Sequence, residues 1–504
     1  MQTSAQKRKL TVSSPETCPS TRTWDRILVV SNRLPFRVDA KGDGKPVIRP
    51  SSGGLVTAMS PLLQERGIAG KWFGWAGAGE EEGLDEALRT RSSTDNFEVG
   101  TVSLTKEEIQ RYYLGYSNEV LAAVLSDEPD MVEVKKAIEC WPVYSRVQAK
   151  YARAIFEDLR PADIVCAQDY HLMGLGSALR VLGSQHLIGF FLHMPFPRKK
   201  VWRTVPQFRL LLRQLLAYDI IGFQIGRFQS NFVDAVREYL PEAAVQIGPD
   251  GIASVSHAGR KTLLGSFPIS IDVVEFERQL YQRSTQVNIR RLKEMVDKGE
   301  KPKIVFNVGR LDPKKGFLQE LRAFKHMLEQ HPDLVGKVLL YQLIIPNKGE
   351  IKANREYKEE VLSLARAINE TYGLAVKQAY THMSRNRYLA YLHIADVQDV
   401  PTMCDGMNLV AKESAIVGNP LTVTVLGKNA GVAEEFAEHA IIVDPKDTER
   451  YADALYVALT MKAAERRRRK SQLKAIVTGN DVFHWWSGQQ EQFFQRLWSE
   501  RFGA

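Results

Sequence analysis

The strongest constraint on the fold of this chain is an alternation that runs along most of its length. Short apolar runs rich in β-branched residues are followed by longer amphipathic stretches, and the order repeats through most of the 504 residues. Strands that alternate with helices predict a parallel sheet covered by helices. The runs expected to be strands are Ile27–Val30, Ile164–Ala167, Leu187–Leu192, Ile304–Val308, Val338–Ile345, Leu421–Val425 and Ala440–Val443.

The length of the chain predicts more than one hydrophobic core, because cores stop growing well below 504 residues. The alternation restarts at Ile304, and Pro268–Asp272 is the natural boundary. We therefore predict an α/β protein with two doubly wound, Rossmann-like domains facing a central cleft. Ligands of such sheets bind beyond the carboxyl ends of the strands. The expected segments are a disordered arm (1–25), a first Rossmann-like domain (26–267), a second Rossmann-like domain (268–479) and a C-terminal helix packing back on the first domain (480–504).

Composition narrows the class of protein. The four cysteines are scattered and form no C-x-x-C pair, which argues against a disulfide framework or a zinc site and favours a reducing cytoplasm. No apolar run approaches the roughly 18 residues of a membrane span, and the polar N-terminus lacks the apolar stretch of a secretory signal. We expect no membrane association.

The net charge of +9 is compatible with nucleic acid or with anionic small molecules as partners. The densest basic run, Arg466–Lys470, follows Glu465 in a stretch of helical composition, and we interpret it as a solvated helix face. The phosphate-binding loop of nucleotide hydrolases is missing. The spaced glycines of Gly74–Gly79 follow aromatic residues and do not match a dinucleotide fingerprint. We expect no nucleic-acid binding.

Two segments of the second half carry candidate anion-binding groups. Arg310 and Lys315 follow the strand at Ile304, where cations and free helix amides together suit a diphosphate. An ordinary solvated basic turn is the alternative. The segment Asp405–Glu413 predicts a turn followed by a helix start, whose amides would face an anion and whose Glu413 would bind ribose hydroxyls. A capped helix with a surface glutamate is the alternative there.

The first half offers polar groups after three of its predicted strands. Asp169 follows the strand at Ile164, and His193 ends the strand at Leu187 in a loop stiffened by two prolines. Arg33 follows the first strand and is suited to hold a phosphate. Gly54 lies in a glycine pair that permits close backbone approach to a ligand.

Taken together, seven segments resemble the trehalose-6-phosphate synthase family of retaining glycosyltransferases, glycosyltransferase family 20. They occur in the family's order, from about Ile27 to Trp486, and read S-N-R-L-P, S-S-G-G-L, W-F-G-W, Q-D-Y-H-L-M, F-L-H-M-P-F-P, R-L-D-x-x-K-G and D-G-M-N-L-V-A-K-E. The resemblance implies a GT-B fold and transfer of glucose from a nucleotide diphosphate, with retention and without a metal or other cofactor. UDP-glucose is the expected donor, glucose 6-phosphate the acceptor and α,α-trehalose 6-phosphate the product.

The resemblance also implies roles for individual residues. Arg310 and Lys315 would hold the diphosphate, Asp405 and His193 the transferred glucose, and these four form the expected catalytic set. The remaining donor-binding residues would be Gly54, Met407, Asn408, Leu409 and Glu413. The acceptor-binding residues would be Arg33 and Tyr113 at the phosphate, Asp169 at the sugar, and Lys348.

Departures from the family pattern gather on the acceptor side. Ala122 stands where the family has a tryptophan, Lys348 where it has an arginine, and Cys404 where it has the arginine before D-G-M-N. The usual S-E-F is replaced by Gly427-Lys428-Asn429. These changes leave open another phosphorylated acceptor, such as glycerol phosphate, or a catalytically weak subunit that senses sugar phosphates. The nucleotide base (UDP, ADP or GDP), a homo-oligomeric state and the role of the arm are likewise left open.

Overall fold

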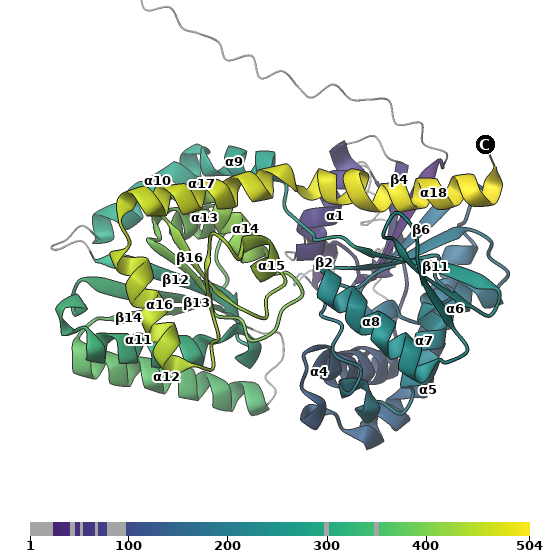
Figure 1. Cartoon of the computed structure of the whole chain (residues 1–504), viewed down its shortest axis with the longest axis horizontal. Coiled ribbons are helices and arrows are strands. Elements are labelled where there is room, and N and C mark those ends of the chain that lie inside the picture. The colour runs from purple at the N-terminus through teal and green to yellow at the C-terminus, as the bar shows by residue number, and fades with distance from the viewer. Residues whose placement is uncertain are drawn as a thin grey trace, which may run out of the picture.

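Two large sheets, each covered by helices, organise the molecule (Figure 1). The computed structural model describes residues 24–40, 46–50, 54–65, 69–77, 97–296, 302–346 and 352–503. The expected arm therefore lies almost entirely outside the described residues. A nine-stranded sheet has the order β5-β4-β1-β6-β7-β8-β11-β10-β9, and a six-stranded sheet has the order β14-β13-β12-β15-β16-β17.

The first sheet is parallel from β5 to β11 and then changes direction. The strand β10 pairs antiparallel with both β11 and β9, so the expectation of a parallel sheet is wrong at this edge. The cause is the two-residue connection Ala258-Gly259, whose positive φ angles of 49° and 75° suit a tight hairpin. The strands are β1 (Arg26–Arg33), β4 (Ala69–Trp75), β5 (Glu98–Thr101), β6 (Asp163–Gln168), β7 (Leu187–Phe191), β8 (Ile220–Phe223), β9 (Ala244–Ile247), β10 (Ala253–His257) and β11 (Arg260–Ser266).

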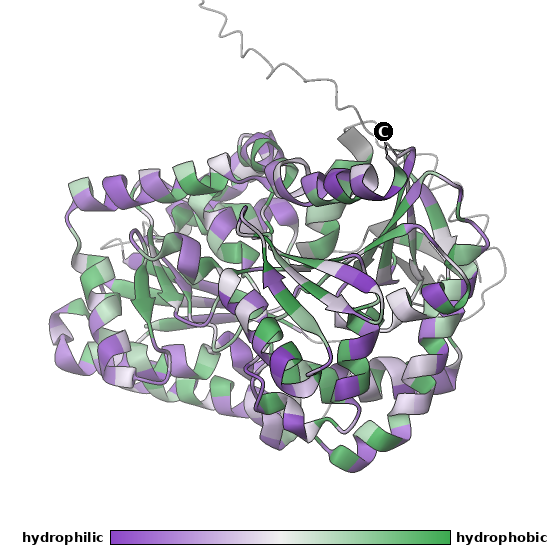
Figure 2. Ribbon diagram, turned by 45° about the vertical axis from the view of Figure 1, so that its right-hand side comes forward, coloured by the Kyte–Doolittle hydropathy of each residue, from purple (hydrophilic) through white to green (hydrophobic). Residues whose placement is uncertain are grey.

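The second sheet is parallel throughout. The strands Val338–Ile345 and Val423–Gly427 are buried almost throughout, which is why they are mostly apolar in the sequence (Figure 2). Its strands are β12 (Lys303–Arg310), β13 (Val338–Ile345), β14 (Val376–Tyr380), β15 (Val397–Val400), β16 (Val423–Gly427) and β17 (Ile441–Val443). A separate hairpin pairs β2 (Phe36–Ala40) with β3 (Pro46–Pro50).

Helices cover the sheets in the order of the chain. Around the first sheet lie α1 (Gly54–Glu65), α3 (Lys106–Glu108), the π-helix η1 (Ile109–Leu121), α4 (Ala122–Leu125), η2 (Pro129–Met131), α5 (Val134–Phe156), η3 (Tyr170–Leu172), α6 (Leu175–Val181), η4 (Val201–Thr204), α7 (Phe208–Leu215) and α8 (Gly226–Tyr239). Around the second lie α9 (Val273–Leu280), α10 (Arg283–Val296), η5 (Pro313–Lys315), α11 (Phe317–Gln330), η6 (Pro332–Leu334), α12 (Lys352–Tyr372), α13 (Arg385–Ile394), α14 (Leu409–Val417), α15 (Val432–Phe436), α16 (Thr448–Thr460) and α17 (Ala463–Gly479).

The C-terminal helices connect the two halves. After α17 the π-helix η7 (His484–Gln490) and α18 (Glu491–Phe502) run along the first sheet, at the top of Figure 1. Trp485 donates its indole N–H to the carbonyl of Phe267 at 3.0 Å, and Phe494 packs against Trp24 with ring centroids 6.2 Å apart. We propose that residues 26–267 and 268–479 are two domains and that residues 480–504 return to the first of them.

The basic run on α17 is not a uniformly solvated face, so that expectation is wrong for two of its five residues. Arg466 and Lys470 are buried, whereas Arg467 and Arg468 are exposed. Arg466 donates to the carbonyls of Leu421 (2.5 Å) and Asp396 (2.7 Å), and Lys470 donates to the carbonyls of Ser414 and Ala415. The buried cations therefore bind backbone carbonyl groups just before β15 and β16 and at the end of α14.

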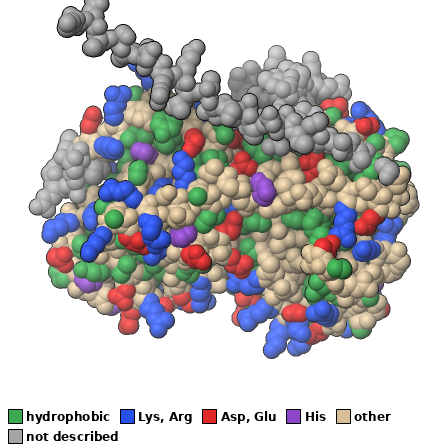
Figure 3. All heavy atoms as spheres, turned by 45° about the horizontal axis from the view of Figure 1, so that its top comes forward, with side chains coloured by type: hydrophobic (Ala, Val, Ile, Leu, Met, Phe, Trp, Pro, Cys, Tyr) green, Lys and Arg blue, Asp and Glu red, His purple; other side chains and the backbone are tan. Residues whose placement is uncertain are grey.

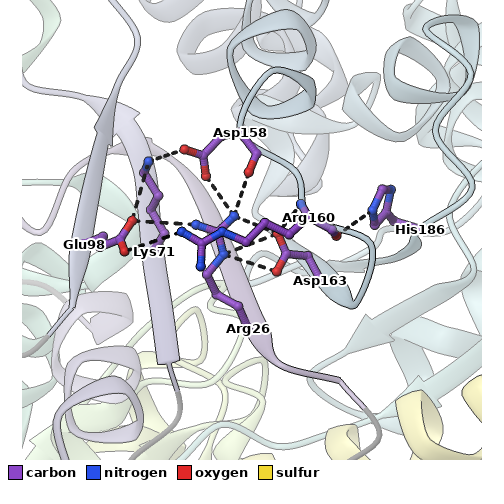
Figure 4. Close-up of polar contacts among 7 residues, drawn as sticks. All are labelled: Arg26, Lys71, Glu98, Asp158, Arg160, Asp163 and His186. Carbon is purple, nitrogen blue, oxygen red and sulfur yellow. Dashed lines mark hydrogen bonds and ion pairs between the residues drawn. The ribbon is translucent and has the colours of Figure 1, made fainter.

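An ion-pair network holds together the amino ends of the first strands (Figure 4). Arg26, the first residue of β1, lies 2.7 Å from Asp163 of β6 and 2.9 Å from Asp158. Lys71 of β4 pairs with Asp158 as well, and lies 3.7 Å from Glu98 of β5. Because these residues sit at the amino ends of parallel strands, the network lies at the edge of the sheet opposite to the expected site.

Surface charges are mixed on the face that carries α17, where Lys and Arg side chains are interspersed with Asp and Glu (Figure 3). Within the described part of the chain, no helix combines the length and the apolar character needed to cross a bilayer.

Candidate functional site

Residues from the carboxyl ends of both sheets meet where the two halves face each other. Gly406 approaches the loop after β7 so closely that a Cβ at this position would lie 1.7 Å from the carbonyl oxygen of His193. Lys314 lies 3.2 Å from Glu128 of the first half, and Arg227 lies 3.5 Å from Glu434 of the second. The candidate residues after β7 and after β15, far apart in sequence, are therefore brought together in one site.

Lys315 and Asp405 form the centre of the donor side. The Lys315 ammonium lies 2.6 Å from Asp405 Oδ2, and Asn408 Nδ2 donates to the same oxygen at 3.2 Å. The backbone holds the two loops in register, because the carbonyl of Lys314 accepts bonds from the Met403 N–H (2.7 Å) and the Thr402 hydroxyl (3.0 Å). This arrangement places an ammonium group and a carboxylate side by side at the carboxyl edge of the second sheet.

Arg310 is the last residue of β12, and its side chain is exposed. Arg310 makes no ion pair with other residues in the described ranges. Burial raises the pKa of the Tyr170 phenol, and the nearby positive charge of Arg310 lowers it in part. Since Tyr170 belongs to η3 of the first half, the Arg310 guanidinium lies on the side of the second sheet that faces the first half, and no described acidic residue pairs with it in competition with an anion.

The helix α14 presents its amino end to the same place. Asn408 precedes it in a left-handed conformation (φ 76°), Met407 is buried, and Leu409 is its first residue. Glu413, one turn further on, is buried and accepts a hydrogen bond from the Tyr388 hydroxyl. Burial raises the pKa of Glu413, although Arg385 and Tyr388 act in the opposite direction.

His193 and Asp169 are adjacent at the edge of the first sheet. His193 Nε2 donates to the side-chain oxygen of Gln168 at 2.9 Å, and the His193 N–H donates to Asp169 Oδ1 at 3.3 Å. Burial lowers the pKa of His193 to about 3, so the imidazole is neutral under ordinary conditions. Burial raises the pKa of Asp169 to about 7, against the effect of three backbone N–H groups.

Arg33 lies in an aromatic setting on the acceptor side. Its guanidinium carbon is 4.7 Å from the ring centre of Trp75 and 5.1 Å from that of Tyr113. The Tyr113 ring is stacked on His171, with centroids 5.8 Å apart. Burial, with a smaller effect of Arg33, lowers the pKa of His171 to about 3. The Arg33 guanidinium thus lies among aromatic rings, in a setting that suits an anion.

Two of the residues that depart from the family pattern, Ala122 and Cys404, lie within the described part of the chain. Ala122 begins α4 directly after the π-helix and is half-buried, and Cys404 lies in the loop before Asp405 near Lys314 and Glu128. Gly54 is the first residue of α1. Lys348 and the residues before Gly54 lie outside the described residues.

Sequence reasoning missed three contributors to the site: Trp75, Gln168 and Tyr388. Trp75 and Gln168 belong to the motifs W-F-G-W and Q-D-Y-H-L-M, from which no role for either residue is predicted. Tyr388 lies on α13 in a stretch without any motif, so no signal in the sequence indicated it. Among the residues that the structure describes, no three His, Cys, Asp or Glu side chains gather in the manner of a metal site.

Comparison with known proteins defines the family. The model of glycosyltransferase family 20 matches residues 25–497, so the chain belongs to this family. A trehalose-6-phosphate synthase of Citrobacter koseri is 31% identical over 478 residues, which cover 94% of this chain and 95% of the relative.

Two solved structures of similar proteins show the same architecture. One, from Burkholderia xenovorans, is a UDP-forming α,α-trehalose-phosphate synthase in complex with glucose-6-phosphate; it has a TM-score of 0.81 and 28% identity, covering 94% of this chain and 99% of that one. The other, from E. coli, is bound with UDP-2-fluoro glucose and has a TM-score of 0.80 and 29% identity, covering 94% and 98%. The expected GT-B fold, with two Rossmann-like sheets facing each other, is confirmed.

Proposed function

We propose that this protein transfers glucose from UDP-glucose to glucose 6-phosphate with retention of configuration, giving α,α-trehalose 6-phosphate. The observation that carries the proposal is the convergence of Arg310, Lys315 and the amino end of α14 on one place, opposite His193 and Asp169. The names of the relatives and the ligands of the two solved structures support the choice of substrates.

The donor side suits a leaving nucleoside diphosphate. Negative charge grows on the diphosphate as the glycosidic bond breaks, and preorganised cations and amides stabilise it without proton transfer. Arg310 and Lys315 supply the cations, and α14 supplies backbone N–H groups. His193 is neutral, so it serves as a hydrogen-bonding group for the transferred glucose, beside Asp405.

The acceptor side suits a phosphorylated sugar. Arg33, with Tyr113 beside it, would bind the phosphate, and Asp169 would accept hydrogen bonds from sugar hydroxyls. Lys348 would assist at the phosphate. The free thiols of Cys140, Cys166 and Cys404 support a location in the reducing cytoplasm.

The test is a transfer assay with purified protein, UDP-glucose and glucose 6-phosphate, read by mass spectrometry of the disaccharide phosphate. Arg310→Ala should lower kcat/KM by at least tenfold, because a charge-assisted contact is worth about 1.5–3 kcal/mol. Lys325→Ala, on the outer face of α11, is the matched control and should be neutral. Turnover by Arg310→Ala within threefold of wild type would contradict the assignment.

Metal independence and acceptor choice are separate arms of the assay. Activity should survive exhaustive treatment with EDTA. A complete loss of activity that magnesium or manganese restores would contradict leaving-group stabilisation by Arg310 and Lys315.

Because Ala122 replaces a large aromatic wall, we expect weak binding of glucose 6-phosphate that Ala122→Trp improves. Faster turnover with glycerol 3-phosphate would identify the alternative acceptor, and turnover with unphosphorylated glucose would contradict the phosphate anchor.

A further inference from the structure

Glu413 is held by two side chains of the neighbouring helix α13. The hydroxyl of Tyr388 donates to Glu413 Oε2, and the Arg385 guanidinium lies 3.8 Å from Oε1, beyond hydrogen-bonding distance. Arg385 is itself held on the other side, because its guanidinium carbon lies 4.1 Å from the ring centre of Phe276 and its Nε donates to Gln279. The only hydrogen bond to the carboxylate from a described side chain therefore comes from Tyr388.

The direction of this carboxylate is set by the geometry of α14. Glu413 follows Leu409 by four residues, so the two lie on the same face of the helix. Side chains of a helix lean toward its amino end, which here is the end that faces the proposed diphosphate. A carboxylate fixed at this point lies where the nucleoside next to that diphosphate would be.

The charge states are consistent with a fixed donor and a fixed acceptor. Burial, reinforced by the neighbouring Glu413, raises the pKa of Tyr388 well above its usual value, so the phenol keeps its proton. The side chain of Glu413 is only 11% exposed, so water replaces a lost hydrogen bond poorly.

We propose that Tyr388 is a positioning residue for the donor: its hydroxyl holds Glu413 Oε2 so that the carboxylate meets the ribose hydroxyls of the nucleotide. This inference rests on the proposed function, because it deepens the role of Glu413 at the donor site. The carboxylate has further lone pairs beyond the one that Tyr388 occupies, so it can bind the phenol and the ribose hydroxyls together.

The test is calorimetric binding of UDP and of 2′,3′-dideoxy-UDP, which lacks both ribose hydroxyls. Wild type should bind UDP at least tenfold more tightly than the dideoxy compound. Tyr388→Phe should lose about tenfold in affinity for UDP and less than twofold for the dideoxy compound, since only UDP uses the oriented carboxylate. A Glu413→Gln variant should bind UDP weakly, and adding Tyr388→Phe to it should change little.

Two outcomes would overturn the inference: unchanged UDP binding by Tyr388→Phe, or an equal loss for both nucleotides, which would mean that the ring contacts another part of the nucleotide. Tyr456→Phe, where the ring is stacked on His331 at 3.6 Å, is the matched control, and thermal unfolding checks that each variant is folded. If the binding pattern is as expected but no trehalose phosphate forms, the reaction is wrong while the assignment of Tyr388 stands.

Discussion

Asp169 shows how one residue combines backbone geometry with an altered charge state. Its φ of 73° is unusual for a residue other than glycine, and it turns the chain sharply at the exit of β6. The same turn buries the carboxyl group beside the His193 loop and raises its pKa to about 7. The site therefore holds a carboxyl group that titrates in the physiological range.

This titration predicts a pH-dependent acceptor affinity. As pH rises from 6 to 8, Asp169 becomes ionised and accepts hydrogen bonds from sugar hydroxyls, so the KM for glucose 6-phosphate should fall several-fold. Asp169→Asn should raise the KM and keep only the smaller dependence that comes from the acceptor phosphate, which ionises near pH 6. If Asp169→Asn shows the same change of KM with pH as wild type, the pH dependence comes from the acceptor phosphate alone.

At the scale of elements, Arg466 of α17 binds the backbone just before β15 and just before β16. Arg466→Ala should lower the free energy of unfolding by about 2–3 kcal/mol, because it removes charge-assisted bonds to two carbonyl groups of part-buried backbone. The adjacent Arg467 is exposed, so Arg467→Ala should stay within about 0.5 kcal/mol. Denaturant unfolding of both variants makes the comparison, and equal effects would show that Arg466 is only a surface charge.

A buried acid pair connects α11 to β15. Glu320 Oε2 accepts bonds from Asn307 (2.7 Å) and Gln342 (2.6 Å), while Asp399 Oδ2 accepts one from Tyr451 (2.6 Å). Glu320 Oε1 and Asp399 Oδ1 are both buried without a hydrogen-bond partner among the described residues, and a proton on one of the two carboxyl groups would let it donate to the other. Burial raises the pKa of both groups, that of Asp399 to about 7.

The acid pair predicts a loss of stability in alkali. The pKa of Asp399 is raised in the folded state. The stabilisation of the fold by the acid pair is therefore complete below the unfolded pKa near 4 and is lost as the pH rises through about 7. In Glu320→Gln the amide donates to Asp399 without titrating. Relative to this variant, wild type should lose up to about 1.4 kcal/mol of unfolding free energy for each pH unit between pH 5 and 7. Glu329→Gln, on the exposed part of α11, is the control, and a pH-independent difference would exclude the shared proton.

At the scale of the whole molecule, the contact between Gly406 and His193 sets how closely the halves approach. A methyl group at 406 would lie 1.7 Å from the His193 carbonyl oxygen, so the two loops must move apart. Displacement of catalytic groups by about 1 Å costs on the order of 100-fold in rate. Gly406→Ala should therefore lower kcat/KM about 100-fold while thermal unfolding still shows a folded protein. Gly479→Ala, where the added methyl meets no atom within 4 Å, should keep full activity, and an active Gly406→Ala would show that the halves adjust freely.

The sequence by itself determined the layered α/β architecture and the strand ends at which the candidate residues lie. Apolar runs such as Val338–Ile345 matched the observed strand, because burial on both faces leaves a local pattern. The motifs located Arg310, Lys315 and Asp405 by a resemblance that covers most of the chain. The strand positions depend on neighbouring residues in the sequence, and the motif residues match a family pattern. Both can therefore be identified from a single sequence.

Only the tertiary structure decided which of these groups touch and in what charge state. The bond from Tyr388 to Glu413 joins two helices, and the contact of Gly406 with His193 joins two sheets, so no periodicity along the chain encodes either. The basic run on α17 has the composition of a solvated face, yet Arg466 and Lys470 are buried and bind backbone carbonyls of distant segments. Burial, pKa and pairing follow from what packs against a residue, and that is set by the fold as a whole.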